Sequence, residues 1–291
     1  MKPVDFDYER PASVAEALHL LSRAGPPAKI LAGGQSLIPL LVTRALRPAC
    51  VIDIGRIAEL GYIREDGAWL RIGATARQAD CAESPLVRAG CPLLAEAIGW
   101  VATPQVRNLG TVVGSLAQRN AISQIPTVAI ALGARLTVAD GAGRRREVAA
   151  ADFVDPASPE TLQPDELVLE AGFPRQPPAM AWDFVEVQRR HAHYAVVGVA
   201  VTFLRDRGGE LCEPRVAVSG VGTCPVRLAA VESALAGRLP TPAVFRAASL
   251  CALADPAMRP LDDLLATADY RREVTPALVR RALGRAWARL A

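Results

Sequence analysis

The sequence predicts an α+β protein of two domains. Segments typical of helices and of strands occur throughout, and the G-x-G-x-x-G fingerprint of a Rossmann domain is absent from the 291 residues. Prolines concentrate between residues 156 and 178 and end in the pair Pro177-Pro178, the best candidate for a domain boundary. Three strand-like segments and then helices follow this pair. We therefore expect one domain over 1–176 and a smaller one over 177–291.

The composition is that of a folded protein without a nucleic-acid or membrane signature. Hydrophobic residues make up 51% and charged residues 22% of the chain, which excludes wholesale disorder. The 33 basic and 30 acidic residues nearly cancel, so we expect no nucleic-acid partner. The N-terminus lacks the apolar core of a signal peptide, and the longest apolar run, 195–204, is about half of the roughly 20 residues that a membrane helix needs. The expected location is the cytoplasm, with no membrane span.

The six cysteines are scattered, and no C-x-x-C pair occurs in the sequence. Zinc and iron–sulfur sites are therefore not expected on this chain, and buried free thiols are favoured over a disulfide framework. His191 and His193 would lie on one face of a strand, but a metal site needs three or four ligands and no third is apparent. No Ser/His/Asp or Cys/His arrangement stands out, so we predict neither a catalytic residue nor a metal site.

Capping and turn residues define the first elements. Ser13 and Glu16 form a capping box that starts a helix, and Gly25 followed by two prolines stops it. Ser36 is expected to cap a second helix. The predicted order is a helix from 14 to 24, a strand over 29–32, a glycine turn, a helix over 37–46 and a strand over 51–54.

Hydrophobic periodicity and turn residues define the rest of the chain. Up to residue 149 we expect a hairpin of 60–64 with 68–74, helices within 76–101 broken at Pro85 and Pro92, an aperiodic segment over 103–120, a helix over 125–133, and a hairpin of 135–139 with 146–149 whose turn carries the solvated triplet Arg144–Arg146. After the double proline we expect strands over 182–188, 195–204 and 216–220, then helices over 226–237, 242–253 and 269–290, the last restarting at Thr275-Pro276, with Asp262-Asp263 as a cap or solvated turn.

Two glycine-rich turns are the candidate binding elements. The first, 33–36, lies between a strand and a helix, where backbone N–H groups, the Ser36 hydroxyl and the helix N-terminus can receive an anion; Lys29 starts the same strand. Such turns also occur in proteins without any ligand. The second, 107–115, combines small residues with hydrogen-bond donors in a long segment. Two such turns in one domain suit a ligand with more than one anionic group, such as a dinucleotide cofactor.

Six segments in a fixed order carry a family resemblance. They are 32–37 (AGGQSL), 53–54 (DI), 72–75 (IGAT), 105–117 (QVRNLGTVVGSLA), 186–190 (EVQRR) and 268–271 (ADYR). The chain resembles the FAD-binding medium subunits of the molybdenum hydroxylases, which include carbon monoxide dehydrogenase and xanthine dehydrogenase. The resemblance covers essentially the whole chain, and the two motifs A-G-G-x-S and R-N-x-G-T-x-x-G-S at this separation are specific.

The resemblance implies a fold, a cofactor and partners. The fold would be a two-part FAD-binding domain of the vanillyl-alcohol-oxidase type, with subdomains of about 1–55 and 56–176, and a C-terminal domain of a three-stranded sheet and helices. The function would be that of an oxidoreductase subunit that relays electrons from iron–sulfur clusters through FAD to a terminal acceptor. The [2Fe-2S] clusters and the molybdopterin cofactor would lie on a small and a large partner subunit, in a dimer of heterotrimers.

The residues expected to contact FAD follow from the same match, with Lys29 added because it lies beside the first turn. They are Lys29, Ala32, Gly33, Gly34, Gln35, Ser36, Leu37, Gly110, Thr111, Gly114, Ser115, Gln118, Asn120, Gln124 and, near the flavin ring, Tyr194.

After Ala117 the chain departs from the family pattern. Family members usually continue His-Ala-Asp-Pro-x-x-Glu-Leu-Pro, whereas here 118–126 reads QRNAISQIP. Both acids are replaced by amides, Asn120 and Gln124, which keep an acceptor oxygen but lose the charge. Arg119 is a new cation that could pair with the FAD diphosphate or block its groove, and Val113 replaces a small residue and would be unfavourable at a positive φ.

These departures leave two alternatives to the flavoprotein subunit. One is a degenerate family member with weak or no FAD binding that acts as a structural or assembly subunit. The other is a stand-alone reductase of the bacterial cell-wall UDP-sugar type, which shares the fold but needs a catalytic acid and a serine that we cannot place in this sequence.

Overall fold

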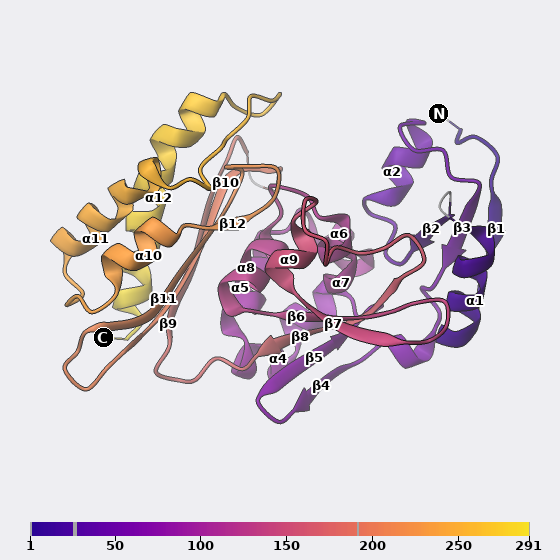
Figure 1. The fold of residues 1–291 in the computed structure, drawn as a ribbon, viewed down its shortest axis with the longest axis horizontal. Coiled ribbons are helices and arrows are strands. Elements are labelled where there is room, and N and C mark those ends of the chain that lie inside the picture. The colour runs from indigo at the N-terminus through magenta and orange to yellow at the C-terminus, as the bar shows by residue number, and fades with distance from the viewer. Residues whose placement is uncertain (1, 26–27, 191, 291) are drawn as a thin grey trace.

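The fold consists of three sheets with helices packed around them (Figure 1). The computed structural model describes residues 2–25, 28–190 and 192–290. The first sheet lies at one end of an elongated molecule, the central sheet in the middle, and the C-terminal sheet at the other end. This mixed helix and strand architecture is the α+β fold that the sequence predicts.

The first sheet is parallel, with strand order β1-β3-β2. Ser13 caps the first helix as predicted, because Ser13 Oγ accepts a hydrogen bond from the Glu16 N–H at 3.2 Å, and the helix ends at Gly25 with a φ of 69°. The capping box is altered, since the Glu16 carboxylate accepts from the Ala12 N–H at 2.7 Å rather than from Ser13. The elements are β1 (Asp7–Glu9), α1 (Val14–Ala24), β2 (Ala28–Leu31), α2 (Leu37–Val42) and β3 (Cys50–Asp53).

The second helix of this unit differs from the prediction at both ends. It stops at Val42 rather than at residue 46, and the Ser36 hydroxyl does not cap it. Ser36 already has helical backbone angles (φ −106°, ψ −41°), whereas a capping serine needs an extended backbone to reach the amides of the first turn. The Ser36 hydroxyl is thus not used by the helix.

The central sheet is antiparallel, with order β4-β5-β8-β6-β7. Both predicted hairpins and the breaks at Pro85 and Pro92 are present. Its middle strand, β8, was not predicted, because 167–173 is almost continuously apolar and lies between two prolines that indicated a loop. The elements are η1 (Ala58–Leu60), β4 (Ile63–Asp66), β5 (Trp69–Gly73), α3 (Gln78–Glu83), α4 (Pro85–Gly90), α5 (Pro92–Trp100), α6 (Pro104–Leu109), α7 (Val112–Gln118), α8 (Gln124–Leu132), β6 (Arg135–Ala139), β7 (Arg145–Ala149), α9 (Ala150–Val154) and β8 (Leu167–Pro174).

The expectation that 103–120 lacks secondary structure was wrong. The segment forms α6 and α7, which are too short to show a helical period. Pro104 takes the first position of α6, and Thr111 Oγ1 caps α7 by accepting from the Gly114 N–H at 2.9 Å. Val113 lies inside α7 without a positive φ, so the strain considered for it does not arise.

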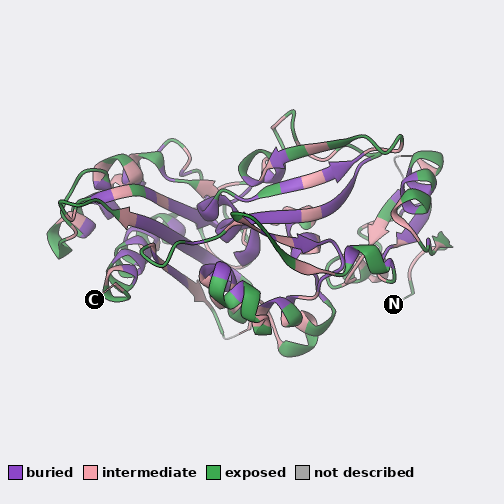
Figure 2. Ribbon diagram, turned by 90° about the horizontal axis from the view of Figure 1, so that it is seen from below, coloured by how far each residue is buried: buried purple, intermediate pink, exposed green. Residues whose placement is uncertain are grey.

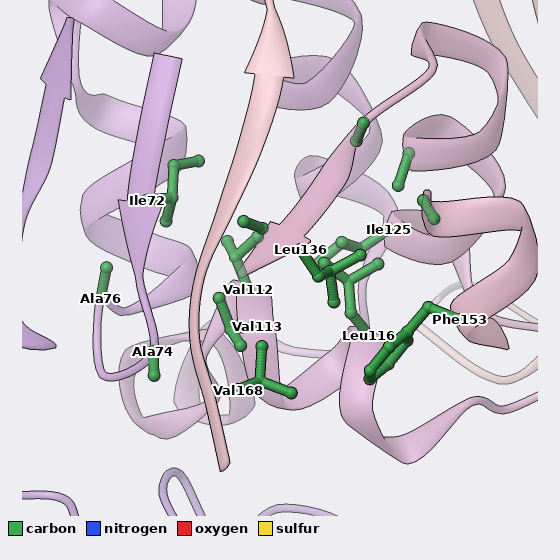
Figure 3. Packing of buried hydrophobic residues seen from close by; sticks show 14 of the residues in the cluster. Ile72, Ala74, Ala76, Val112, Val113, Leu116, Ile125, Leu136, Phe153 and Val168 are labelled. Carbon is green, nitrogen blue, oxygen red and sulfur yellow. The ribbon is translucent and has the colours of Figure 1, made fainter. Parts of the chain in front are cut away.

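The inner face of α7 anchors the second glycine turn in the hydrophobic core. Val112, Val113 and Leu116 are buried, and they pack with side chains of β5, β6, β8 and α9 (Figure 3). Phe153 of α9 is among the largest fully buried side chains of this cluster. Because the core holds α7 on one side, the turn that precedes it is fixed in place.

The C-terminal sheet is antiparallel, with order β12-β11-β10-β9. Helices α10 to α12 cover one face and the central helices α5 and α8 lie against the other, so the strands between them are largely buried (Figures 1 and 2). The two-residue strand β12 adds to the three predicted strands. The elements are β9 (Ala181–Gln188), β10 (Ala195–Arg205), β11 (Leu211–Ser219), β12 (Val226–Arg227), α10 (Ala229–Leu235), α11 (Pro242–Leu250), η2 (Cys251–Ala254) and α12 (Ala268–Ala288).

The last helix does not restart at Thr275-Pro276, as we had expected. It runs unbroken from a cap at Thr267, and Pro276 lies inside it. The Thr275 hydroxyl donates to the carbonyl oxygen of Arg271 at 2.6 Å, and both Thr275 and Pro276 are buried against the sheet. Tertiary packing therefore compensates for the stability that is lost with the backbone hydrogen bond that the proline cannot donate.

Ion pairs tie the C-terminal sheet to the central helices. Arg289, the C-cap residue of α12, donates to Glu96 of α5 at 2.7 Å and to Asp183 of β9 at 3.0 Å. Arg285 adds contacts to the same two carboxylates. Asp183 is fully buried, so these cations stabilise a carboxylate that water does not reach.

Within the described part of the chain, no helix combines the length and the apolar character that crossing a bilayer requires.

Candidate cofactor-binding site

A cavity of about 800 Å³ lies where the three parts of the fold meet. Its walls come from the first glycine turn, the segment from α6 to the start of α8, and residues 192–195, which lead into β10. The structure brings all fifteen predicted site residues to this cavity: Lys29, Ala32, Gly33, Gly34, Gln35, Ser36, Leu37, Gly110, Thr111, Gly114, Ser115, Gln118, Asn120, Gln124 and Tyr194. The volume is within the range of about 300–1,000 Å³ that is typical of ligand sites.

The two glycine turns touch each other through their backbones. A Cβ atom on Gly33 would lie 2.4 Å from the carbonyl oxygen of Leu109 and 2.8 Å from the Cα of Gly110. Gly34 has a φ of 74°, which L-residues with a side chain rarely adopt. The sequence needs glycine at both positions for these reasons, and the contact joins the first sheet to α6 and α7.

The first glycine turn presents free amide groups. Among the residues that the structure describes, none accepts a hydrogen bond from the backbone N–H of Gly33, Gly34, Gln35 or Ser36. The Gln35 side chain donates to the Gly33 carbonyl oxygen at 3.1 Å and thereby braces the turn. Backbone amides gathered in this way can hold an anionic group such as a diphosphate.

Two residues that line the cavity each carry a buried side-chain atom without a hydrogen-bond partner among the described residues. These atoms are Oε1 of Gln78 and Nδ1 of His193. A buried polar group without a hydrogen bond costs about 1–3 kcal/mol, so both atoms fit a site that a polar ligand fills. The sequence predicted neither residue as a ligand contact. Gln78 follows no motif, and only its place in the folded chain brings it to the site.

Residues 162–168 form one side of the cavity, and two arginines hold the segment that contains Thr161 and Glu166 in place. Arg119, which has a φ of 51° at the end of α7, donates to the Thr161 hydroxyl. Arg146 donates to both carboxylate oxygens of Glu166, at 2.6 and 2.8 Å, so this member of the predicted solvated triplet is an ion-pair residue instead. Burial raises the pKa of Glu166, but the hydrogen bonds from Arg146 and from the Gln163 N–H outweigh it and lower that pKa.

The two substituted amides have different surroundings. Asn120 Oδ1 accepts from the Ile122 N–H at 3.1 Å, so it stabilises the local turn. Gln124 is buried at the start of α8, where its amide nitrogen donates to Glu186 of β9. Gln118 is exposed at the edge of the cavity.

The histidine pair weighed as a metal site can be examined only in part. His191 of the predicted pair lies outside the described residues. Within 2–25, 28–190 and 192–290, no three His, Cys, Asp or Glu side chains gather as metal ligands would. All six cysteines are free thiols; four are buried as expected, whereas Cys212 and Cys251 are only partly buried.

Comparison with known proteins identifies the family. Residues 4–176 match the family described as the FAD binding domain in molybdopterin dehydrogenase, and residues 182–286 match the CO dehydrogenase flavoprotein C-terminal domain. The chain belongs to the FAD-binding medium subunits of the molybdenum hydroxylase family.

Full-length relatives agree with this assignment to the molybdenum hydroxylase family. The carbon monoxide dehydrogenase medium chain of Hydrogenophaga pseudoflava is 37% identical over 100% of both chains. The alpha subunit of the 6-hydroxypseudooxynicotine dehydrogenase complex of Paenarthrobacter nicotinovorans is 36% identical over 98% of this chain and 96% of its own. A solved carbon monoxide dehydrogenase from H. pseudoflava that lacks the Mo-pyranopterin moiety has a chain with a TM-score of 0.94, 38% identity and full coverage of both chains.

The family membership settles the class of function. The chain carries an FAD-binding domain and is the flavoprotein component of an oxidoreductase complex. The comparisons support this flavin-binding subunit and not the alternative of a degenerate member that has lost the flavin. They equally leave no role for the stand-alone reductase, because both domains match the subunit family.

Proposed function

We propose that the chain binds FAD in the 800 Å³ cavity and relays electrons from the iron–sulfur clusters of a partner subunit to a terminal acceptor. The backbone contact between the two glycine turns is the observation that carries this proposal, because it turns two separate sequence motifs into one wall of one site. FAD suits the role because a flavin exchanges electrons singly or in pairs.

Different residues of this chain would bind different parts of the cofactor. The free amides of 33–36 and the ammonium group of Lys29 would hold the diphosphate. The amide of Gln124 and the buried Oε1 of Gln78 would accept hydrogen bonds from the sugar or ribityl hydroxyls. Tyr194, whose side chain is 63% exposed at the cavity, would lie against the flavin ring.

We further propose that the chain assembles with a small [2Fe-2S] subunit and a large molybdopterin subunit as a dimer of heterotrimers. The relatives are named as medium chains or as subunits of complexes, which supports partners of this kind.

We also propose domains of 1–176, with parts of about 1–55 and 56–176, and of 177–291; the three separate sheets support these divisions. The free cysteines are typical of the reducing cytoplasm, where we expect the complex to act.

Purification of the chain with its co-expressed neighbours tests the proposed function. We expect a complex that contains iron and molybdenum and shows a flavin absorbance at about 450 nm, which is a property of the flavin itself. A stable complex with clusters and molybdenum but without flavin would exclude the proposed role.

Removing the ammonium group beside the first turn should weaken FAD binding. A hydrogen bond to a charged group contributes about 1.5–3 kcal/mol, so the Lys29→Met variant should bind FAD at least about tenfold more weakly. Titration of flavin-free protein with FAD measures the change. Lys2→Met is the matched control, because Lys2 is the other lysine of the chain, is exposed and does not line the cavity. Equal affinities for the two variants would exclude a phosphate contact by Lys29.

A further inference from the structure

A partly buried amide–carboxylate pair joins the FAD cavity to the C-terminal sheet. Gln124, the first residue of α8, lines the cavity, and Glu186 lies on β9. The Gln124 Nε2 donates to both carboxylate oxygens of Glu186, at 3.0 and 3.3 Å. The Gln188 Nε2 donates to the same carboxylate from the same strand.

Glu186 has no ionic partner among the described residues. On β10 the residue opposite it is Gly198, and α8 carries no charged side chain. The single charged residue of α5, Glu96, pairs with Arg285 and Arg289 instead. The Glu186 carboxylate thus interacts with two neutral amides, and no charged group of the described residues shifts its pKa.

A carboxylate in this position dictates how the neighbouring amide is turned. An ionised carboxylate only accepts hydrogen bonds, so it must face the NH₂ end of the Gln124 amide. The carbonyl oxygen is then the polar atom that remains for the cavity, and no donor among the described residues is bonded to it. An acceptor at this place suits a hydroxyl group of the bound cofactor.

We propose that Glu186 is a positioning residue, which acts through Gln124 by presenting the Gln124 carbonyl oxygen to a hydroxyl group of FAD. This inference rests on the proposed binding of FAD in the cavity. It assigns a role to a residue that does not line the cavity and that the cofactor need not touch. It also explains why an amide works at position 124, because the charge of the pair is carried by Glu186.

Protonation of Glu186 should weaken its effect on the orientation of the Gln124 amide. Burial raises its pKa to about 7, although the hydrogen bonds from Gln124 and Gln188 act in the opposite direction. A protonated carboxyl both donates and accepts, so it no longer selects one end of the Gln124 amide. FAD affinity should therefore be highest above pH 7 and should fall as the pH decreases through about 7.

Titration of the flavin-free full chain with FAD between about pH 6 and 8.5, a range that spans the protonation of Glu186, tests the proposal. In Glu186→Gln, residue 186 can donate or accept at every pH. We expect FAD binding about tenfold weaker than wild type at the upper end of this range and without the wild-type pH dependence. The double variant Gln124→Glu with Glu186→Gln restores an amide–carboxylate pair with an acceptor at the cavity, so it should recover most of the affinity.

A matched variant distinguishes an effect on the orientation of the Gln124 amide from a general effect on packing around Glu186. Gln188→Met removes one donor to Glu186 but leaves Gln124 unchanged. Because that donor favours the ionised carboxylate, the midpoint of the pH dependence should move to higher pH while the affinity at high pH is retained. Circular dichroism and thermal melting verify that each variant is folded.

The outcomes distinguish this inference from the proposed function. A wild-type chain that binds no FAD at any pH would overturn the proposed function and the inference with it. A wild-type chain that binds FAD, together with a folded Glu186→Gln variant of the same affinity and pH profile, would overturn only the role of Glu186. A Glu186→Gln loss that the double variant does not recover would likewise exclude positioning through Gln124.

Discussion

Replacing Gly33 by valine should abolish FAD binding. The added Cβ would lie 2.4 Å from the Leu109 carbonyl oxygen and 2.8 Å from the Gly110 Cα, and both are backbone atoms that cannot move aside as a flexible side chain can. The two glycine turns would have to separate, which would displace the free amides of 33–36 from the second turn. We expect the purified complex to lose its flavin absorbance while its other subunits remain associated.

Gly99→Ala is the matched control for this variant. Gly99 lies in α5 of the same chain, has no neighbouring atom within 4 Å of the position that a Cβ would take, and does not line the cavity. Alanine is favoured over glycine inside a helix by roughly 1 kcal/mol, so this variant should retain its flavin and melt at the same or a higher temperature. Full flavin occupancy in Gly33→Val would show that the contact between the turns is not needed for binding.

Replacing Arg271 by alanine should strongly destabilise the fold. Its side chain is 2% exposed, and its guanidinium group donates to the carbonyl oxygens of Val196 and Gly220 and, at 2.6 Å, to Asp263. Removing it leaves two buried carbonyl oxygens without this donor and creates a cavity. A buried group left unpaired costs about 1–3 kcal/mol, so the free energy of unfolding should fall by about 3 kcal/mol or more.

The adjacent arginine provides the control for this experiment. Arg272 is about half exposed and pairs with Asp269, which is almost fully exposed. Exposed ion pairs contribute at most about 1 kcal/mol, so Arg272→Ala should change stability little. Urea denaturation of the two variants measures the difference. Similar unfolding midpoints would show that the buried hydrogen bonds of Arg271 contribute no more than a surface ion pair.

Arg271 also gives a physical reason for one motif of the resemblance. The segment 268–271 reads as a family signature, but the sequence could not show what its arginine does. In the structure Asp262 and Asp263 accept hydrogen bonds from backbone amides, as expected of caps or turn residues. Asp263 also pairs with Arg271, and the arginine reaches the backbone of Val196 near the start of β10. The motif therefore holds the C-terminal sheet in shape beside the cavity.

Local signals were sufficient for many elements but not for contacts between distant segments. The caps at Ser13 and Gly25 and the breaks at Pro85 and Pro92 each act within one turn of chain, so the sequence predicted them well. Strand β8 was missed because its burial on both faces removes the alternation of polar and apolar residues. The break expected at Pro276 was overridden by packing against the sheet.

In the candidate site, too, local motifs were predicted and contacts between distant segments were not. The glycine turns were found from their motifs, and all the residues predicted around them line the cavity. Gln78, His193 and Glu186 were not predicted as cofactor-site residues, because each becomes relevant only through the place that folding gives it. Arg146 was assigned to solvent from its neighbours in sequence, whereas its partner Glu166 lies on a different segment.

The cavity has walls from all three parts of the fold, and this gives the cofactor a thermodynamic role beyond electron transfer. A ligand that binds only the native arrangement adds RT ln(1 + [L]/Kd) to the free energy of unfolding, about 2.7 kcal/mol at a hundred times Kd. FAD bound between the first glycine turn, α7 and residues 192–195 would act as a cross-link between segments far apart in the chain. Cofactor supply would then set how much of the newly made subunit reaches a form able to assemble.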